Sequence, residues 1–479
     1  MNFSSLHKPS LLTGGSALIR VPPELAGLLL LGLLLRAVVL VLFPGHQAED
    51  LDAYLGIARE VLAGNGFCSP GSATPTAYRP PLYPVLLAVV LPLGNWGLPL
   101  LHLGLSSVML ATIWLTGARL GLTRNGQVFA VLLAAIDPLL LWYGSYPMTE
   151  ALCAALTALA LLQLTRWPVA SCGNRQWLEG AITGILLGLC VLSRPTYWVW
   201  LGLLVVRGAF QLVNRNTGWL AARSTGTPSA ARADRTSWHS VVPGLACLLG
   251  IVVTVAPWVI RNTLALGSPV MMTTHGGYTL LLANNPSFYQ HEVDQPWGTI
   301  WRGAPFDEWS AGVLQELEEQ QIRGEVAIDR WQQQRALEFI QANPDRFARA
   351  CVHRLLMFWN GVPASPTGEP LPRIVRWGLA AGYKTWWLLA AVGLWHVFRV
   401  RNGPNSPPGS RESPGEEALV GAASWWPSVL LVVAFTAMHT VYWSNIRLRA
   451  PIIPAVALLA GAACGLRRLQ LSSERPGDR

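Results

Sequence analysis

The chain is poor in charged residues and almost free of lysine. Of its 479 residues, 13% are charged and 52% are hydrophobic, and Lys8 and Lys384 are the only lysines. A soluble domain carries about 25% charged residues, so the composition argues against a soluble globular protein. Long apolar runs recur, most of them near the roughly 20 residues that a membrane-spanning helix needs. The sequence therefore predicts an all-α, polytopic membrane protein.

Several catalytic and binding motifs are also missing. The sequence has no Walker motif, no G-x-G-x-x-G after a strand and no G-x-S-x-G, so ATP-driven transport and serine hydrolase chemistry lack support. Its seven cysteines show no CxxC or metal-type spacing. The net charge of +9 would suggest nucleic acid on a soluble domain. Most arginines here lie between apolar runs and indicate membrane topology, so no nucleic-acid partner is expected.

Hydropathy predicts about ten spanning helices in a bundle, together with a small outer α-rich subdomain. The expected spans are 24–43, 97–118, 126–145, 148–165, 179–194, 196–213, 240–260, 374–398, 424–443 and 450–466. A shorter apolar piece, 82–93, is expected to be interfacial or re-entrant. Arg36 lies inside the first run, so it must snorkel or face the bundle interior.

Charge asymmetry predicts the orientation and the division into regions. Arginines cluster in alternate connecting segments, which places the N-terminus inside. The first outer loop, which carries the candidate active site, then lies on the outer, periplasmic side of the inner (plasma) membrane. Three regions are expected. Residues 1–260 form an N-terminal transmembrane module, whose first outer loop is 44–96. Residues 261–373 form an outer soluble subdomain, and residues 374–479 form C-terminal transmembrane helices. Within the subdomain, we expect turn-rich sequence from His275 and amphipathic helices over 304–341 and 344–359.

The first outer loop carries three carboxylates shortly after the first apolar run, at Glu49, Asp50 and Asp52. Asp50 and Tyr54 are four residues apart and would share one face of a helix, where Tyr54 is expected to contact the substrate. A carboxylate here can act as general base toward a hydroxyl or amine, or bind a divalent cation that neutralises a phosphate. Asp50 is the first choice as catalytic carboxylate, before Asp52, and Asp50 with Glu49 is the candidate metal set. The alternative is a solvated, acidic helix start.

Basic residues and a second acid complete the candidate site. Arg79 is held by two prolines in AYRPPLYP, where its guanidinium can bind a phosphate or anchor at lipid headgroups. Glu150 opens the fourth span and is either a second catalytic carboxylate or a partner of the helix dipole. Four more arginines lie near outer ends of spans, where they bind substrate phosphate or snorkel to headgroups, namely Arg194, Arg261, Arg447 and Arg449.

The pattern of segments resembles the GT-C membrane glycosyltransferases. It is most similar to the bacterial, glycosyltransferase family 39-like branch related to protein O-mannosyltransferases and lipid A aminoarabinose transferase. The matching pieces are spread over most of the chain: D-x-x-x-Y at Asp50 and Tyr54, LAGNGF, PTAYRPPLYP, GILLGLCVLSRP, APWVIRNTLALGSPV, GGYTLLLANNP and RLRAPIIP.

The resemblance implies transfer of a sugar from a polyprenyl-phosphate donor to a protein, lipid or glycan acceptor on the outer membrane face, usually with inversion. It implies that Asp50 serves as base or metal ligand, that Arg79 contacts the donor phosphate, and that Glu150 is the acid opening the fourth span. Some relatives use a divalent cation and others do not. The acid here lies in an E-D-L-D run, so the choice between Asp50 and Asp52 stays open.

The main rival is a transporter or flippase for a lipid-linked or anionic substrate, which would use the same arginines without chemistry. Transporters commonly have paired, inverted repeats with helices broken at matching positions, and the sequence contains no such repeat. A membrane scaffold is a third possibility, although it would not need acids at the outer surface. The sequence does not choose among sugars or acceptors.

Overall fold

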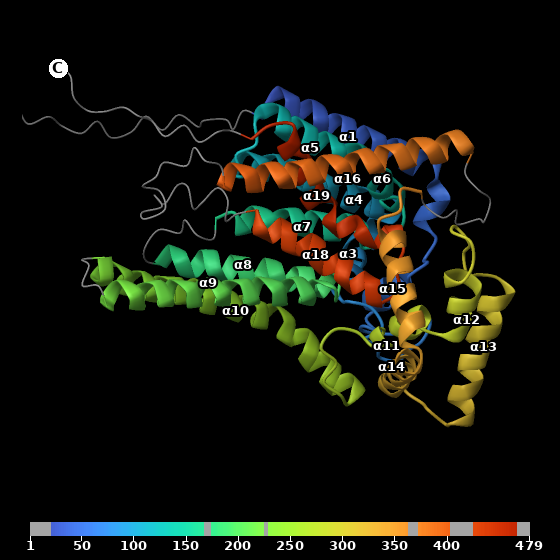
Figure 1. Cartoon of the computed structure of the whole chain (residues 1–479). Coiled ribbons are helices and arrows are strands. Elements are labelled where there is room, and N and C mark those ends of the chain that lie inside the picture. Colours follow the sequence, from blue (N-terminus) through green and yellow to red (C-terminus); the bar gives the residue numbers. More distant parts are fainter. Residues whose placement is uncertain (1–20, 167–173, 225–228, 363–371, 403–424, 467–479) are drawn as a thin grey trace, which may run out of the picture.

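The computed structural model describes residues 21–166, 174–224, 229–362, 372–402 and 425–466, and these residues are helical or irregular (Figure 1). The described residues contain no β-sheet. Two isolated backbone bridges join Cys68 to Pro75 and Leu122 to Leu466. The expected all-α fold class is therefore confirmed.

Long helices run side by side in one bundle (Figure 1). They are α1 (Pro23–Leu42), α4 (Gly97–Arg119), α5 (Arg124–Ile136), α7 (Glu150–Leu164), α8 (Asn174–Ser193), α9 (Tyr197–Ser224), α10 (Ser229–Leu266), α16 (Arg373–Asn402), α18 (Trp426–Val441) and α19 (Ile453–Ala463). Every expected span overlaps one of these helices. The expected span 126–145 is broken into α5 and α6 (Pro138–Tyr143), because Pro138 has no N–H to continue the helix and Asp137 caps the new one.

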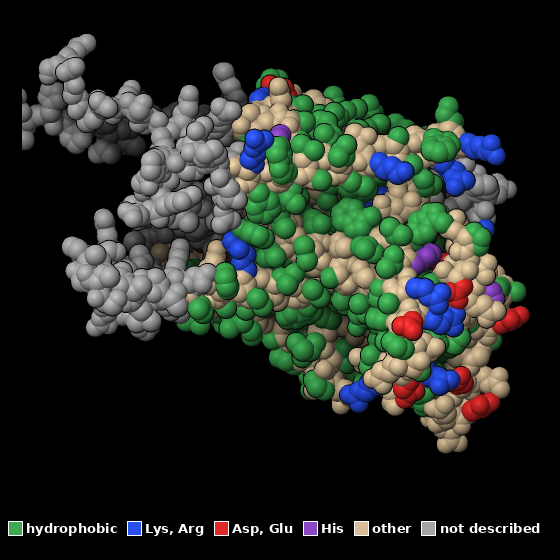
Figure 2. Space-filling model, in the orientation of Figure 1, with side chains coloured by type: hydrophobic (Ala, Val, Ile, Leu, Met, Phe, Trp, Pro, Cys, Tyr) green, Lys and Arg blue, Asp and Glu red, His purple; other side chains and the backbone are tan. Residues whose placement is uncertain are grey.

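The number of spans is confirmed only in part. Five helical stretches among the described residues are long and apolar enough to cross a membrane, at 23–42, 82–119, 176–193, 242–266 and 446–463. Three shorter apolar helices consist of residues 124–136, 150–164 and 426–441. Figure 2 shows hydrophobic side chains covering the flank of the bundle. Such a surface suits lipid better than water, which indicates a multi-pass membrane protein.

The short apolar piece 82–93 forms α3 (Leu82–Val90) and the start of a 3-10 turn, η2 (Leu91–Trp96). Gly94 has φ 59° and ψ −136°, a conformation that glycine adopts readily, and it separates this piece from α4. The piece is helical as expected. Its expected place at the membrane interface stays a prediction.

The region 261–373 contains a group of shorter helices at one end of the bundle (Figure 1). They are α11 (Gly276–Ala283), α12 (Pro286–Phe288), α13 (Ala304–Glu319), α14 (Glu325–Ala342) and α15 (Pro344–Phe358). We call these helices and their connections the outer subdomain, after the side of the membrane on which the sequence predicts them. Residues 276–283 are helical, although the sequence indicated turns there. The amphipathic helices expected over 304–341 are α13 and α14, which are separated where Gln321 and Gly324 adopt positive φ.

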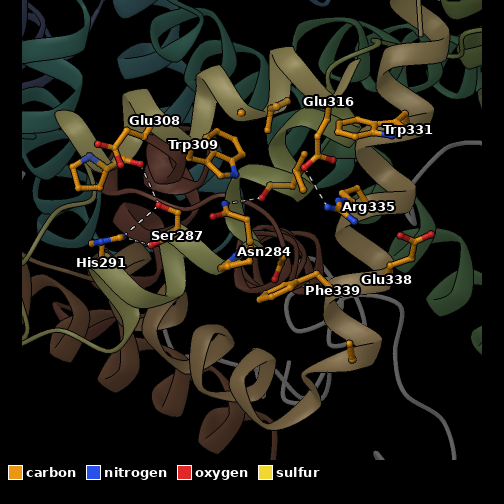
Figure 3. A pocket seen from close by; sticks show the side chains of 17 residues that line it. Asn284, Ser287, His291, Glu308, Trp309, Glu316, Trp331, Arg335, Glu338 and Phe339 are labelled. Carbon is orange, nitrogen blue, oxygen red and sulfur yellow. Dashed lines mark hydrogen bonds and ion pairs between the residues drawn. The ribbon is translucent and has the colours of Figure 1, made fainter. Parts of the chain in front are cut away.

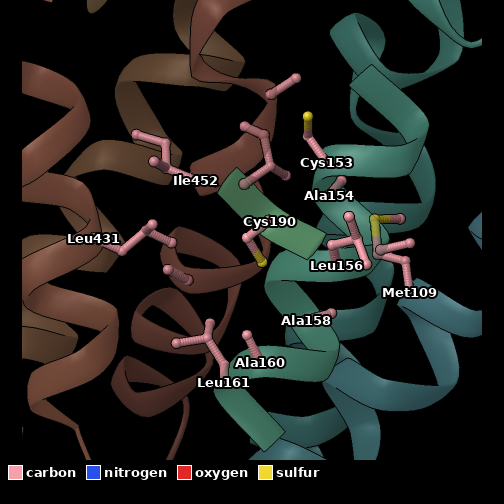
Figure 4. Packing of buried hydrophobic residues seen from close by; sticks show 14 of the residues in the cluster. Met109, Cys153, Ala154, Leu156, Ala158, Ala160, Leu161, Cys190, Leu431 and Ile452 are labelled. Carbon is pink, nitrogen blue, oxygen red and sulfur yellow. The ribbon is translucent and has the colours of Figure 1, made fainter. Parts of the chain in front are cut away.

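Helix α7 lies at the centre of the bundle, and most of its side chains are buried. Figure 4 shows its small residues, such as Ala154 and Ala158, packed among Met109 of α4, Cys190 of α8 and Leu431 of α18. Small side chains let neighbouring helices approach closely without relying on the hydrophobic effect. The first residue of this central helix is Glu150, so the core of the bundle positions a carboxylate at its own end.

Candidate functional site

Five charged side chains from five separate segments meet at the start of α7. We call them the ion-pair cluster: Asp52, Arg79, Glu150, Arg194 and Arg447. Asp52 precedes α2 (Tyr54–Leu62), Arg79 precedes α3, Arg194 follows α8, and Arg447 lies in the 3-10 helix η4 (Ile446–Ile452). The cluster therefore depends on the tertiary fold.

The charges in the ion-pair cluster alternate in sign. Asp52 Oδ1 lies 3.2 Å from Arg79 Nη2, and Asp52 Oδ2 lies 2.9 Å from Arg447 Nη1. Glu150 Oε1 lies 3.3 Å from Arg447 Nε and 3.2 Å from Arg194 Nη2. Arg447 thus bridges the two carboxylates. Three guanidinium groups face two carboxylates, which leaves a formal excess of one positive charge for an anionic ligand.

The two aspartates of the E-D-L-D run have different roles. Asp50 turns back to cap α2, because Oδ1 accepts the Leu55 N–H at 2.9 Å and Oδ2 accepts the Gly56 N–H at 2.6 Å. Ala53 then adopts a left-handed conformation, φ 61° and ψ 13°, which is rare for a residue with a Cβ. That turn lets Asp52 enter the ion-pair cluster. Asp52, which the sequence ranked after Asp50, is therefore the aspartate that meets Arg79.

Arg79 is fixed on several sides. Its Nε donates to the backbone carbonyl of Asp52 at 2.7 Å. Its guanidinium carbon lies 4.6 Å from the centroid of the Tyr78 ring and 5.4 Å from that of the Tyr54 ring. Stacked and hydrogen-bonded, this arginine loses little further freedom when it meets a ligand. Tyr54, expected as a substrate contact, lies beside the ion-pair cluster as packing for Arg79.

Polar atoms in the ion-pair cluster have unused hydrogen-bonding capacity. Arg194 Nη1 and Glu150 Oε2 are buried without a hydrogen-bond partner among the described residues, and the buried Arg447 Nε has only its 3.3 Å ion pair with Glu150 Oε1. Buried polar groups normally have partners, so such orphaned atoms require an explanation. An anionic group that accepts from the arginines would satisfy two of the three.

Burial and neighbouring charges tune the groups outside the spans. Burial alone would raise the pKa of Asp52, but Arg447 and Arg79 outweigh it, and the pKa is lowered. Asp52 is therefore ionised at neutral pH. Burial raises the pKa of Tyr54 to about 12, so its phenol stays neutral. Burial, aided by Arg79, lowers the pKa of His275 to about 3, so this imidazole beside Tyr78 is uncharged.

Two of the expected phosphate-binding arginines lie outside the ion-pair cluster. Arg261 donates to the backbone carbonyls of Phe67 and Thr76, so it ties parts of the first outer loop to α10. Arg449 is fully buried and donates to the carbonyls of Phe358 and Asn360. These contacts hold backbone segments together. The other two nitrogens of Arg449, Nε and Nη2, are buried without a hydrogen-bond partner among the described residues, and its guanidinium carbon lies 4.2 Å from the centroid of the Tyr383 ring.

Glu325, at the start of α14, was missed by the sequence interpretation. Its carboxylate accepts the Thr76 hydroxyl at 2.6 Å and the Ala77 N–H at 2.7 Å, and it also accepts the Thr274 hydroxyl. It fixes the outer subdomain to the segment just before Arg79. Glu325 lies 249 positions from Thr76 in the chain, and no local motif marks the pair, so only the tertiary fold reveals this contact.

The candidate metal set does not fit a cation. Both carboxylate oxygens of Asp50 already accept backbone N–H groups, and Glu49 is exposed. In the part of the chain that the structure describes, no three His, Cys, Asp or Glu side chains gather as a metal site. We therefore derive no step through a metal.

No protein-family model, curated protein or solved structure matches this chain. The function is therefore argued from the site.

Proposed function

We propose that the protein is a multi-pass membrane glycosyltransferase of the GT-C type. It takes a sugar from a polyprenyl-phosphate donor and transfers it, with inversion, to a protein, lipid or glycan acceptor at the outer face of the inner membrane. The observation that carries the proposal is the alternating arrangement of the ion-pair cluster at one end of an apolar bundle, where both a phosphate and an acceptor hydroxyl find partners.

The arginines suit the leaving group. When the sugar leaves its carrier, the polyprenyl phosphate gains negative charge on its oxygens. Arg194 Nη1 is buried without a hydrogen-bond partner among the described residues, and Arg447 Nε has only its ion pair with Glu150, so both arginines can donate to a phosphate. Because they are already held by Glu150, they need little reorganisation as charge develops.

Asp52 suits the acceptor. In the proposed step, the acceptor oxygen attacks the anomeric carbon on the face opposite the phosphate, and the bond from that carbon to the phosphate oxygen breaks. The hydroxyl proton passes to Asp52, and the electron pair leaves with polyprenyl phosphate. A carboxylate with a lowered pKa is a weak base. Asp52 therefore accepts the hydroxyl proton most readily after the acceptor oxygen has begun to bond to the anomeric carbon, which makes the proton more acidic. Positioning of acceptor and donor then supplies much of the rate.

The test replaces Asp52 by Asn in the chromosomal gene, with Asp307→Asn on the exposed surface of α13 as the matched control. Glycans and glycoproteins of the cell envelope are then analysed by mass spectrometry. We expect Asp52→Asn to reproduce the glycan loss of a deletion strain while the protein still accumulates in the membrane, and Asp307→Asn to leave the glycans unchanged.

A flippase for the same lipid would give a different result. In vesicles with donor supplied at the outer face, a flippase variant at Asp52 would leave transfer intact and change only donor movement across the bilayer. Envelope glycans that are unchanged in both the deletion and the Asp52→Asn strains would refute the proposed function.

A further inference from the structure

A cavity lies apart from the ion-pair cluster, in the outer subdomain between α13 and α14 (Figure 3). Its volume is about 640 Å³, within the range of roughly 300–1,000 Å³ that is typical of ligand pockets. Residues from α11 and α12 also line it, and no member of the ion-pair cluster does. We call it the α13–α14 cleft.

The α13–α14 cleft is acidic. Glu308, Glu316 and Glu338 line it, against a single arginine, Arg335. Arg335 pairs with Glu316 at 3.3 Å. Glu338 accepts from the Gln334 amide, a neutral group, and Glu308 has no ion-pair partner among the described residues. Two of the three carboxylates therefore have no neutralising charge, although the chain as a whole carries +9.

The same cleft presents aromatic and aliphatic surface. Trp309 comes from α13, and Trp331 and Phe339 come from α14 (Figure 3). Trp331 is held in place because its indole N–H donates to Gln320 at 2.9 Å. Aromatic faces attract ammonium and guanidinium groups. Apolar lining from Val313 and its neighbours matches the methylene stem of a lysine or arginine side chain.

We propose that the α13–α14 cleft binds a basic peptide segment. Its guanidinium or ammonium groups would meet Glu308 and Glu338, and their stems would lie over Trp309 and Trp331. A neutral oligosaccharide also stacks on tryptophan, but it does not account for two carboxylates without a counter-charge beside the rings. The proposal is independent of the transfer chemistry, because it uses no residue of the ion-pair cluster.

The test uses the full chain in phosphatidylcholine nanodiscs, which carry no net lipid charge. A fluorescein-labelled peptide containing three arginines and otherwise glycine is titrated and followed by fluorescence anisotropy. Glu308→Gln with Glu338→Gln should weaken its binding by about tenfold, as expected for the loss of charge-assisted contacts. The matched control is Glu318→Gln with Glu319→Gln, an equal charge change on exposed residues of α13 that do not line the cleft.

The control should change binding by less than about twofold, as for other exposed charges. Binding should also weaken as salt rises. Equal losses in the two double variants would show general attraction to an acidic surface and overturn the proposal. The proposal would also be overturned if the protein bound maltoheptaose, a neutral oligosaccharide, and did not bind the arginine peptide. Both double variants replace exposed residues, and equal melting temperatures in detergent check that both fold.

Discussion

Two sets of arginines in this molecule differ in what their guanidinium groups contact. The three in the ion-pair cluster face carboxylates. A second set, which we call the carbonyl-bound arginines, donates chiefly to backbone carbonyls and consists of Arg36, Arg261, Arg354 and Arg449. Arg447 and Arg449 belong to different sets although they are only two residues apart in η4.

The difference separates folding from function. Carbonyl dipoles do not move, so an arginine bound to them joins helices: Arg36 of α1 faces the bundle interior and reaches the carbonyls at the end of α5. Arg354 likewise ties α15 to the carbonyls of Ala283 and Thr440. An arginine facing a carboxylate has a partner of opposite charge, and its remaining N–H groups are available to an anion. We therefore expect the carbonyl-bound arginines to control stability and the arginines of the ion-pair cluster to control transfer.

The largest expected effect is the loss of transfer activity caused by replacing Arg447. Arg447→Met removes the bridge between Asp52 and Glu150 together with one donor to the phosphate. Loss of a preorganised donor lowers turnover by about 100-fold or more. The measurement is the transfer rate of purified protein with a polyprenyl-phosphate sugar donor. A variant that keeps its melting temperature and its full rate would remove Arg447 from the proposed site.

The matched change two residues later should affect stability instead. Arg449→Met leaves the buried carbonyls of Phe358 and Asn360 without their donor. Unpaired buried groups destabilise by about 1–3 kcal/mol each. We expect a melting temperature several degrees lower in detergent, with an unchanged KM for donor in the fraction that stays folded. A raised KM at an unchanged melting temperature would place Arg449 with Arg447 and erase the distinction between the two sets.

Glu325→Gln should have an intermediate effect, on the connection between the outer subdomain and the segment before Arg79. The glutamine keeps one oxygen acceptor but cannot accept from Thr76, Ala77 and Thr274 as the carboxylate does. Misplacing Arg79 should lower kcat by about tenfold. Glu318→Gln, exposed on the neighbouring helix α13, is the control. Equal rates in the two variants would show that this contact does not position Arg79.

Much of the fold could be predicted from the sequence, because apolar runs of spanning length mark helices without knowledge of their partners. The break at Asp137–Pro138 and the division near Gly324 are visible only as single residues within long helical patterns. The candidate site was harder to predict. The sequence prediction named every member of the ion-pair cluster, but it ranked Asp50 above Asp52, because the spacing to Tyr54 assumes a regular helix and the left-handed Ala53 breaks it.

The arginines show the same limit. Arg194 and Arg261 both lie near the ends of spans, and hydropathy treats them alike. Only the tertiary fold determines that one meets Glu150 and the other meets carbonyls of the first outer loop. Glu325 carries no local signal at all. Position along a span can therefore predict that an arginine lies near the membrane surface, whereas its partner depends on packing.

The smallest expected effect is that of pH, and it tests the electrostatics of Asp52. Its pKa in the folded chain lies below the ordinary value of about 3.9, because Arg447 and Arg79 outweigh burial. The ion pairs of Asp52 therefore contribute stability above about pH 4, and that contribution is lost as pH falls through the folded pKa. The melting temperature should show no Asp52-dependent step between about pH 5 and 8, as a comparison of wild type with Asp52→Asn would reveal. A step in that interval, present only when Asp52 is intact, would mean that its carboxylate takes up a proton far more readily than two neighbouring guanidinium groups allow.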